Sequence, residues 1–305
     1  NNTRVIHSRL FFRKPTGAVI EVFCLSPFLP EDYQISFEKR DKVVWSCMIG
    51  NSRRWKDDML KMEIAVDDGV VVLNARKVSN LANNTQVEFS WENDAYTFSE
   101  LLEKAGNLPI PPYLNRESEA QDDETYQTVY STIEGSVAAP TAGLHFTPEV
   151  LASMSEDNIK INYATLHVGA GTFKPVKSDT ISGHQMHAEF ISVDRSLIAD
   201  LIENINNIVV VGTTSMRTVE SLYYIGKQIL RGGDKVNSRF FVSQWEPYEE
   251  EDEGDCSPLD ALQAILDYMD GNNVTKLYAE TEIIIAPGYE FHYPKAIVTN
   301  FHQPQ

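Results

Sequence analysis

Four histidines lie in short segments rich in glycine, threonine and asparagine in the second half of the chain: His145, His167, His187 and His302. Imidazole changes its charge near neutral pH, so histidine is the usual proton carrier of enzymes. In mixed α/β folds, the loops at strand ends collect such functional groups. The pattern predicts an enzyme that works by acid–base chemistry.

Two glycine-containing turns in this half of the chain resemble cofactor-binding loops but lack the full motifs. The turn at 169–171 is not a dinucleotide fingerprint, because Lys174 stands where the third glycine belongs. The segment at 211–215 is not a P-loop either, since the G-x-x-x-x-G-K pattern is absent. Its residues Thr213 and Thr214 open a predicted helix whose N–H groups could bind an anion, although ordinary helix capping explains them without a ligand.

A metal site is the next possibility, because His184, His187 and Glu189 lie within six residues of one another. Histidine and carboxylate groups can bind zinc together. Their spacing matches no familiar ligand pattern, and isolated histidines are more often structural groups. We therefore expect no metal and keep a metal-dependent hydrolase as the weakest alternative.

Composition indicates a soluble globular protein. The chain has 305 residues, 42% of them apolar, which is enough for about two domains with their own cores. No apolar stretch approaches the roughly 18 residues that a membrane span needs. The three cysteines are scattered, which argues against a disulfide framework and suits a reducing cytosol.

Charge bears on possible partners. The chain carries 26 Lys and Arg against 44 Asp and Glu, a net charge of −18, and seven of the acids lie in the run at 246–255. Without that run the charge would still be −11. An RNA partner would therefore need a local basic patch. The candidates are Arg4, Arg9, Arg13 and Lys14, or Arg53, Arg54 and Lys56 beside Trp55, although a solvated loop explains each cluster taken alone.

The elements that must position these groups fall into two kinds. Up to about residue 92 the pattern predicts short strands that form a meander or small barrel, at 19–25, 33–37, 43–49, 70–75 and 85–91. A helix follows, from the capping box at Thr97 and Glu100 to Gly106. The proline-rich segment at 108–114 and the polar stretch after it indicate a connection between domains.

Beyond that connection, helices and strands alternate. Helices are predicted to open at Thr147-Pro148 and Ser257-Pro258, and further helices to cover 194–206 and 216–229. Strands are predicted at 161–168, 208–211, 283–286 and 296–300. This half of the chain is therefore expected to be mixed α/β.

Several strings together resemble the S-adenosylmethionine:tRNA ribosyltransferase-isomerase family over almost the whole chain. They are NNTRVIHSRLFFRKPTGAVIEV (1–22), LPIPPYLNR (108–116), YQTVYSTIEGSVAAPTAGLHFTPEVL (126–151), TLHVGAGTFKPV (165–176), HQMHAEF (184–190), VGTTSMRTVESL (211–222), IAPGYEF (285–291) and TNFHQPQ (299–305). Near the start, the family usually has Val-Ile-Pro-Ala-Arg, whereas this chain has Val5-Ile6-His7-Ser8-Arg9. Its members begin several dozen residues earlier, so the first residue, Asn1, is typical of a fragment.

The resemblance implies an α+β fold of two domains. The larger would be a mixed α/β barrel-like domain made of residues 1–8 and 108–305. The smaller would be an antiparallel β-barrel domain, residues 9–107, inserted near the N-terminal part of the larger one.

The implied activity transfers and isomerises the ribosyl moiety of S-adenosylmethionine onto 7-aminomethyl-7-deazaguanine in tRNA. Adenine and methionine leave, and epoxyqueuosine-tRNA is formed in queuosine biosynthesis. The resemblance implies no separate cofactor, because S-adenosylmethionine is consumed as a substrate. A cytoplasmic monomer that acts on tRNA, without a membrane, is expected. The main alternative is a non-catalytic tRNA-binding relative.

The resemblance also implies which residues form the site. We expect His145 and His167 to share acid–base work, and Glu189 to balance the sulfonium or orient His187. Arg217 is expected to bind the methionine carboxylate. The remaining expected substrate contacts are Thr141, Thr213, Thr214, Tyr126, Gln127 and His302.

Overall fold

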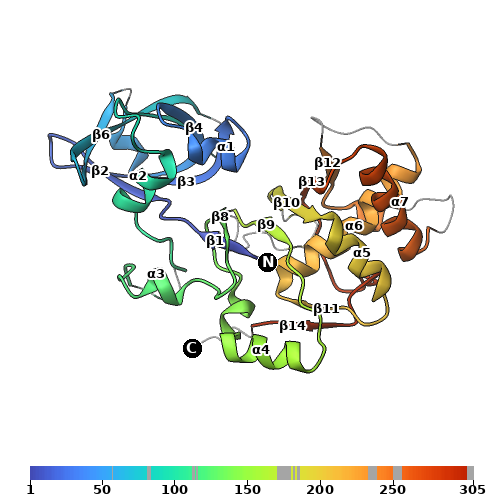
Figure 1. Cartoon of the computed structure of the whole chain (residues 1–305). Helices are drawn as coiled ribbons and strands as arrows, with labels where there is room; N and C mark the ends of the chain where they lie inside the picture. The colour runs from blue at the N-terminus through green and yellow to red at the C-terminus, as the bar shows by residue number, and fades with distance from the viewer. Residues whose placement is uncertain are drawn as a thin grey trace. The chain divides into compact units, whose positions relative to one another are not determined.

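A computed structural model of the chain describes residues 1–56, 58–80, 84–111, 114, 116–169, 180, 183, 186–232, 239–249 and 256–300. Two compact units are present (Figure 1). The barrel unit comprises Arg4–Glu124 and Glu134–Ala138, and the mixed unit comprises Asn1–Thr3, Thr125–Ile133 and Ala139–Gln305. Within the described ranges, every helix is too short or too polar to span a membrane.

The barrel unit is built on a six-stranded antiparallel sheet, whose members in spatial order are β2 (Arg9–Arg13), β3 (Val19–Leu29), β4 (Lys42–Gly50), β7 (Thr85–Ser90), β6 (Gly69–Asn80) and β5 (Leu60–Val66). The two outer strands, β2 and β5, also contact each other, so the sheet is nearly closed. Alternate residues point inward, as with Leu10 and Phe12 of β2. An α+β fold with an antiparallel barrel-like sheet is therefore confirmed.

Aromatic rings fill the interior of this sheet. Phe98 lies 5.5 Å from Trp45 and 5.3 Å from Phe89, measured between ring centroids. The Trp45 indole is fully buried and donates to Ser36 Oγ at 2.8 Å, which satisfies its N–H group inside the core. The barrel unit thus has its own hydrophobic core.

Short helices complete the barrel unit: α1 (Tyr33–Glu38), α2 (Phe98–Ala105), α3 (Asp122–Thr125, at the end of the unit) and the 3₁₀ turn η1 (Ser52–Arg54). The predicted capping box of α2 is confirmed, because Thr97 accepts from Glu100 N–H and Glu100 accepts from Thr97 N–H. The strand predicted at 33–37 is wrong. Asp32 accepts from Ile35 N–H at 2.9 Å and thereby caps a helix there instead.

The mixed unit contains a four-stranded sheet, in the order β12 (Phe240–Val242), β13 (Lys276–Thr281), β10 (Glu189–Asp194) and β9 (Thr165–His167). A second sheet pairs β11 (Val209–Val211) in parallel with β14 (Ala296–Val298). The remaining strands, β1 (Thr3–Val5) and β8 (Ile133–Ser136), pair with each other, and all but the first residue of each belongs to the barrel unit. Two expected strands differ: 161–168 is a strand only at 165–167, and 283–286 is not one.

The helices of the mixed unit are α4 (Pro148–Glu156), α5 (Arg195–Glu203), α6 (Thr213–Leu230) and α7 (Pro258–Gly271), with 3₁₀ turns η3 (Thr141–His145) and η6 (Glu246–Tyr248). The predicted caps Thr147 and Ser257 are confirmed. Helix α6 packs against α7 and against strands β9, β12 and β13. One side of α6 therefore faces the sheet on which the site residues lie.

Candidate active site

A buried ion pair joins two of the sequence segments that carry candidate residues. Glu189 begins β10, and Arg217 lies in the second turn of α6, where its Nη1 donates to Glu189 Oε2. Only 9% of the Glu189 side chain and 13% of the Arg217 side chain are exposed. A buried charge of this kind is tolerated when its partner is in contact with it. The pair fixes the start of β10 against α6.

The other guanidinium nitrogens of Arg217 bind backbone carbonyls at the end of β13 and just after it. Nε donates to Ile283 O at 3.0 Å, and Nη2 donates to Thr281 O at 3.4 Å. Ser221, one turn further along α6, contacts Thr281 Oγ1 at 2.8 Å. The Arg217 side chain thus occupies the Ile283 carbonyl, the first one that a strand at 283–286 would offer to a neighbouring strand.

The electrostatic setting of Glu189 is mixed. Burial raises the pKa of its carboxyl group, while the Arg217 charge and the Gly169 N–H, 3.4 Å from Oε1, act in the opposite direction. Burial is the largest of these effects, so the pKa of Glu189 lies above that of a carboxyl group in water.

His167 ends β9, next to this pair. It is directly opposite Phe190 in the register of β9 and β10, and the two rings lie 5.7 Å apart. Only 5% of His167 is exposed. His167 and Glu189 therefore lie at one end of two neighbouring strands, with the imidazole on the same face of the sheet as Phe190 and Glu189, the residue before Phe190, on the other face.

A second grouping surrounds the first turn of α6. Gly212, the N-cap residue, has a φ of +85°, and a Cβ added there would lie 3.6 Å from Ala142 Cβ in η3. Turn η3 begins at Thr141 and ends at His145. Thr213 and Thr214 follow Gly212 directly, so the structure brings Thr141, Thr213 and Thr214 into one region.

His145 is exposed, and its Nε2 lies 3.4 Å from Asn300 Oδ1. Asn300 follows β14, and β14 pairs with β11, the strand that leads into α6. Three segments that are far apart in the sequence therefore converge at the N-terminus of this helix.

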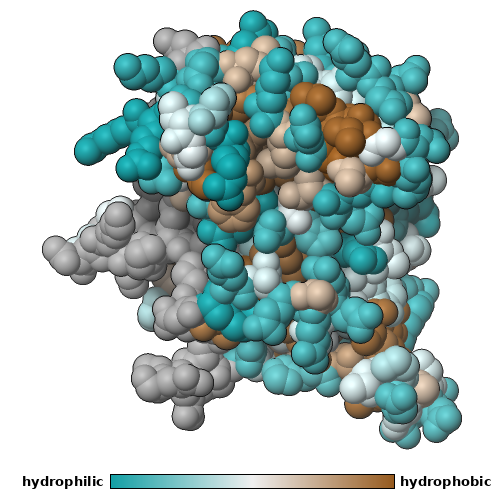
Figure 2. All heavy atoms as spheres, turned by 90° about the vertical axis from the view of Figure 1, so that its left-hand side faces the viewer, coloured by the Kyte–Doolittle hydropathy of each residue, from teal (hydrophilic) through white to brown (hydrophobic). Residues whose placement is uncertain are grey.

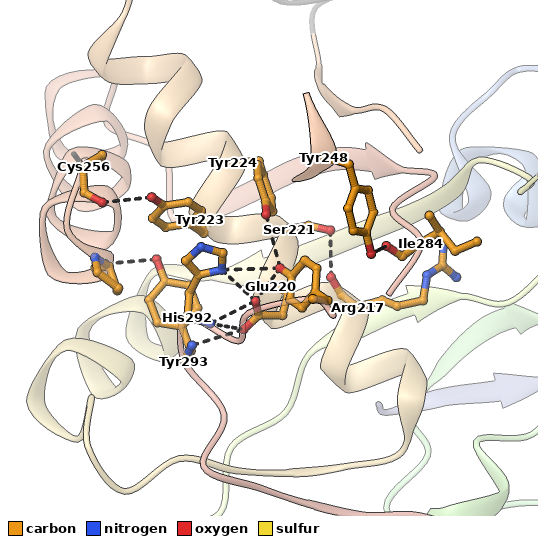
Figure 3. Close-up of polar contacts among 12 residues, drawn as sticks. Arg217, Glu220, Ser221, Tyr223, Tyr224, Tyr248, Cys256, Ile284, His292 and Tyr293 are labelled. Carbon is orange, nitrogen blue, oxygen red and sulfur yellow. Dashed lines mark hydrogen bonds and ion pairs between the residues drawn. The ribbon is translucent and has the colours of Figure 1, made fainter. Parts of the chain in front are cut away.

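A third cluster, missed from the sequence, centres on Glu220, which is fully buried (Figure 3). The Glu220 carboxylate accepts from the N–H groups of His292, at 3.1 Å and 3.2 Å, and Tyr293, at 3.1 Å. It also binds Tyr289 Oη at 2.5 Å and His292 Nδ1 at 2.9 Å. A charge without solvent needs such donors.

Aromatic rings enclose this carboxylate. The His292 ring stacks on Tyr223 with centroids 3.6 Å apart and an angle of 17° between the planes. Burial and the neighbouring Glu220 raise the pKa of Tyr289, and burial raises the pKa of Tyr224 to about 12. Both phenols therefore stay protonated at neutral pH and act as donors.

Other expected residues lie outside these groupings. His187 is exposed in the segment before β10, Tyr126 is buried, and Gln127 is partly exposed, after α3. His184 and His302 lie outside the described residues. In the part of the chain that the structure describes, no three His, Cys, Asp or Glu side chains form a group that could hold a metal ion.

A cavity of about 450 Å³ also lies in the mixed unit. Among the residues that line it are Tyr130, Phe146, Leu151, Leu197, Ile208 and Ser215. Its described lining includes none of the expected site residues. The cavity borders the first turn of α6 through Ser215 and reaches Phe146, the residue after His145.

Comparison with known families identifies the class of enzyme, which the geometry of the site does not do alone. The model of the family described as "Queuosine biosynthesis protein" matches residues 1–305. The chain belongs to the queuosine biosynthesis protein family. No solved structure matches the chain significantly.

Members of the queuosine biosynthesis protein family are S-adenosylmethionine:tRNA ribosyltransferase-isomerases, and this chain is an enzyme of that kind. The expected family and activity are confirmed. The family implies S-adenosylmethionine and tRNA as substrates.

Proposed function

We propose that ribosyl transfer takes place beside the Glu189–Arg217 ion pair, with His167 and His145 as proton carriers and the first turn of α6 as part of the substrate site. The observation that carries this proposal is the direct buried contact of Glu189 with Arg217, at the end of the sheet where His167 also lies. An ionisable group buried beside a specific charged partner is a common feature of active sites.

The reaction needs proton transfer in two directions. A base removes a proton from the carbon beside the sulfonium, and the bond from the ribosyl group to adenine breaks while an acid gives adenine a proton. The unprotonated amine of 7-aminomethyl-7-deazaguanine forms a C–N bond to the ribosyl group and loses a proton. Methionine leaves with the electrons of its carbon–sulfur bond as an oxygen of the ribosyl group forms the C–O bond that closes the epoxide. We assign the base and acid to the pair His145 and His167, because imidazole can serve in both roles near neutral pH.

The contacts of Arg217 favour a positioning role. All three of its guanidinium nitrogens have partners, namely Glu189, Ile283 O and Thr281 O. Binding the methionine carboxylate through Arg217 therefore requires some of these contacts to be exchanged, and it stays a prediction. Glu189, held by Arg217, would balance the sulfonium charge, and an interaction of Glu189 with His187 also stays a prediction.

The first turn of α6 is suited to an anionic group of the substrate. A helix N-terminus has N–H groups with no partner inside the helix and carries a partial positive charge. We propose that Thr213 and Thr214, with Thr141 from the adjoining turn η3, bind the substrate here. Tyr126 and Gln127 would contact a base, and His302 stays a prediction outside the described residues.

The 450 Å³ cavity is a weaker candidate for the reaction centre. Its described lining has no histidine, and its one carboxylate, Asp200, binds Lys160. The chemistry requires proton carriers, so we place the proposed centre at the ion pair instead.

Adenine release tests the proposal directly. The protein is incubated with S-adenosylmethionine and tRNA that carries the deazaguanine precursor, and adenine is measured by chromatography. We expect adenine only when both substrates are present, and a loss of at least 100-fold, roughly the usual contribution of an acid–base group, in His167→Gln. The matched control Glu203→Gln alters an exposed residue of α5 and should retain full activity.

The alternatives give different results. A non-catalytic tRNA-binding relative would bind S-adenosylmethionine or tRNA and release no adenine. A metal-dependent hydrolase would lose its activity with a chelator. Full adenine release by His167→Gln and Glu189→Gln would move the reaction centre elsewhere.

The finer organisation also belongs to this proposal. We infer that residues 1–8 and 108–305 form a barrel-like catalytic domain into which residues 9–107 are inserted. The two compact units support a division in two, with other bounds: they group residues 4–8, 108–124 and 134–138 with the barrel unit. We further propose that the enzyme acts in the cytoplasm as a monomer. Sedimentation at micromolar concentration tests the oligomeric state.

A further inference from the structure

We propose that a basic cleft on the barrel unit binds the phosphodiester backbone of the tRNA substrate. The basic cleft has a volume of about 580 Å³ and is lined by Lys14, Thr16, Gly17, Ala18, Arg53, Arg54 and Lys56. Four of these seven residues are cations and none is an acid. The inference rests on the proposed function, because it takes tRNA as the ligand.

Two turns that are 40 residues apart in the sequence form the walls of the cleft. One is the tight turn between β2 and β3, closed by Lys14 N–H to Ala18 O at 2.9 Å and Gly17 N–H to Lys14 O at 2.9 Å. The other is η1 and the residues that follow it. Lys14 Nζ joins the walls by donating to Arg54 O at 3.0 Å. The structure thus merges parts of the two basic clusters that are separate in the sequence.

A buried tryptophan supports the second wall. Trp55 is 2% exposed, and its Nε1 donates to Asp58 O at 2.8 Å. Lys77 Nζ donates to Trp55 O at 2.5 Å and lies 4.9 Å from the centre of the indole ring. The backbone that carries Arg53, Arg54 and Lys56 is therefore anchored in the barrel core.

The cations of the cleft differ in what they already bind. Lys14 is paired with Asp58 at 2.8 Å and serves the structure of the cleft. Arg53, Arg54 and Lys56 are exposed, and among the described residues no carboxylate pairs with them. Figure 2, drawn from the side on which Figure 1 shows β2 and β6, presents a mainly hydrophilic surface. Exposed cations on such a surface can reach a polyanion.

Phosphate is the ligand that this chemistry favours. The planar guanidinium groups of Arg53 and Arg54 can each bind two oxygens of one phosphate, and Lys56 adds a point charge. A chain with a net charge of −18 repels RNA elsewhere, so the approach of tRNA requires a local reversal of sign. An acidic protein segment would meet the same cations, but tRNA is the anionic macromolecule that the family's activity supplies.

Binding of tRNA at several salt concentrations tests the inference. In Arg53→Glu/Arg54→Glu, we expect weaker binding and a log–log salt slope that is shallower by about 0.7 to 0.9 for each phosphate that the protein no longer neutralises. In adenine release, the KM for tRNA should rise, while the KM for S-adenosylmethionine and kcat at saturating tRNA stay unchanged. Arg53→Gln/Arg54→Gln should show the same effects more weakly.

The matched control reverses two exposed cations elsewhere in the barrel unit, Lys42→Glu/Lys61→Glu. It changes the net charge equally and should leave the slope and the KM unchanged. Equal losses in this control would overturn the inference, because total charge would then explain the effect. Unchanged tRNA binding in both arginine variants would overturn it as well. Absence of adenine with the wild-type protein would count against the proposed function alone, since tRNA binding is measured without turnover.

Discussion

Arg217 and Glu220 stand three residues apart on α6 and bind opposite ends of the same segment: Arg217 Nε donates to Ile283 O, and Glu220 accepts from the His292 N–H group. The segment between these two contacts contains the Pro287-Gly288 turn and Tyr289. One helix therefore determines the course of a loop that follows β13. This relationship links the proposed reaction centre to the Glu220 cluster.

Removal of Arg217 is expected to affect stability as well as activity. Arg217→Ala leaves the Glu189 carboxylate buried without its countercharge, which should lower the free energy of unfolding by about 3 kcal/mol. Urea denaturation followed by circular dichroism measures this decrease. In Glu189→Gln/Arg217→Ala no charge is left unpaired, so part of the stability should return. Additive decreases in the double variant would contradict the ion pair.

The Glu220 cluster should be sensitive to a change that keeps its shape. Glu220→Gln replaces one acceptor oxygen by an NH₂ group, which faces donors such as Tyr289 Oη and the N–H groups of 292 and 293. We expect a decrease of about 2 kcal/mol in the free energy of unfolding. Glu203→Gln, on the exposed side of α5, is the control and should change it by less than about 0.5 kcal/mol.

The contact between α6 and α7 depends on Gly226. A Cβ at this position would lie 2.3 Å from Ala261 O, which is backbone and cannot move alone. Alanine favours a helix over glycine by about 1 kcal/mol, but the overlap with this carbonyl should make Gly226→Ala less stable than the wild type. Gly271→Ala, at the end of α7, meets no atom within 4 Å and should not destabilise the protein. Thermal unfolding compares the two variants.

Acid stability should depend on Asp122 in the barrel unit. Arg116 donates to its two oxygens at 2.6 Å and 2.7 Å, and these bonds lower the pKa of Asp122 from 3.8 to about 2. The unfolded chain then binds more protons than the folded one between these values. The stabilisation is therefore complete above about pH 5 and disappears as the pH falls toward 2.

Tryptophan fluorescence can follow this acid transition, because Trp45, Trp55 and Trp91 lie in the barrel core. Asp122→Asn should be less stable near neutral pH, and its stability should fall less between pH 5 and pH 2. Asp68→Asn, in the exposed turn between β5 and β6, is the control with wild-type behaviour. An unchanged acid transition in Asp122→Asn would contradict the assignment.

Elements with local signals could be predicted from the sequence. Helix α2 is predictable because Thr97 and Glu100 cap it within one turn, and α7 because Ser257 precedes Pro258. The prediction at 33–37 failed because the alternating apolar residues of this segment also suit a strand. The side chain of Asp32 caps the segment as a helix instead. Capping was the stronger signal there.

The candidate site was predictable only in part. Glu189 and Arg217 could be chosen from their strings, but their contact depends on how β10 and α6 pack, which no local pattern encodes. Glu220 and His292 are 72 residues apart, and a carboxylate within a helical pattern is usually exposed. The only available signal was that Glu220 lies within the family-like string at 211–222 and His292 directly follows the one at 285–291.

Helix α6 also fixes the spacing of the residues that lie along it. Along it stand Gly212 at the cap, Thr213 and Thr214, then Arg217, Glu220 and finally Gly226 against α7. Each residue of a helix advances about 1.5 Å and turns by about 100°. A single inserted residue anywhere between Arg217 and Gly226 would therefore rotate every later side chain away from its partner. The number of residues in this stretch is as tightly constrained as their identity, so length variation in this enzyme should be confined to segments outside α6.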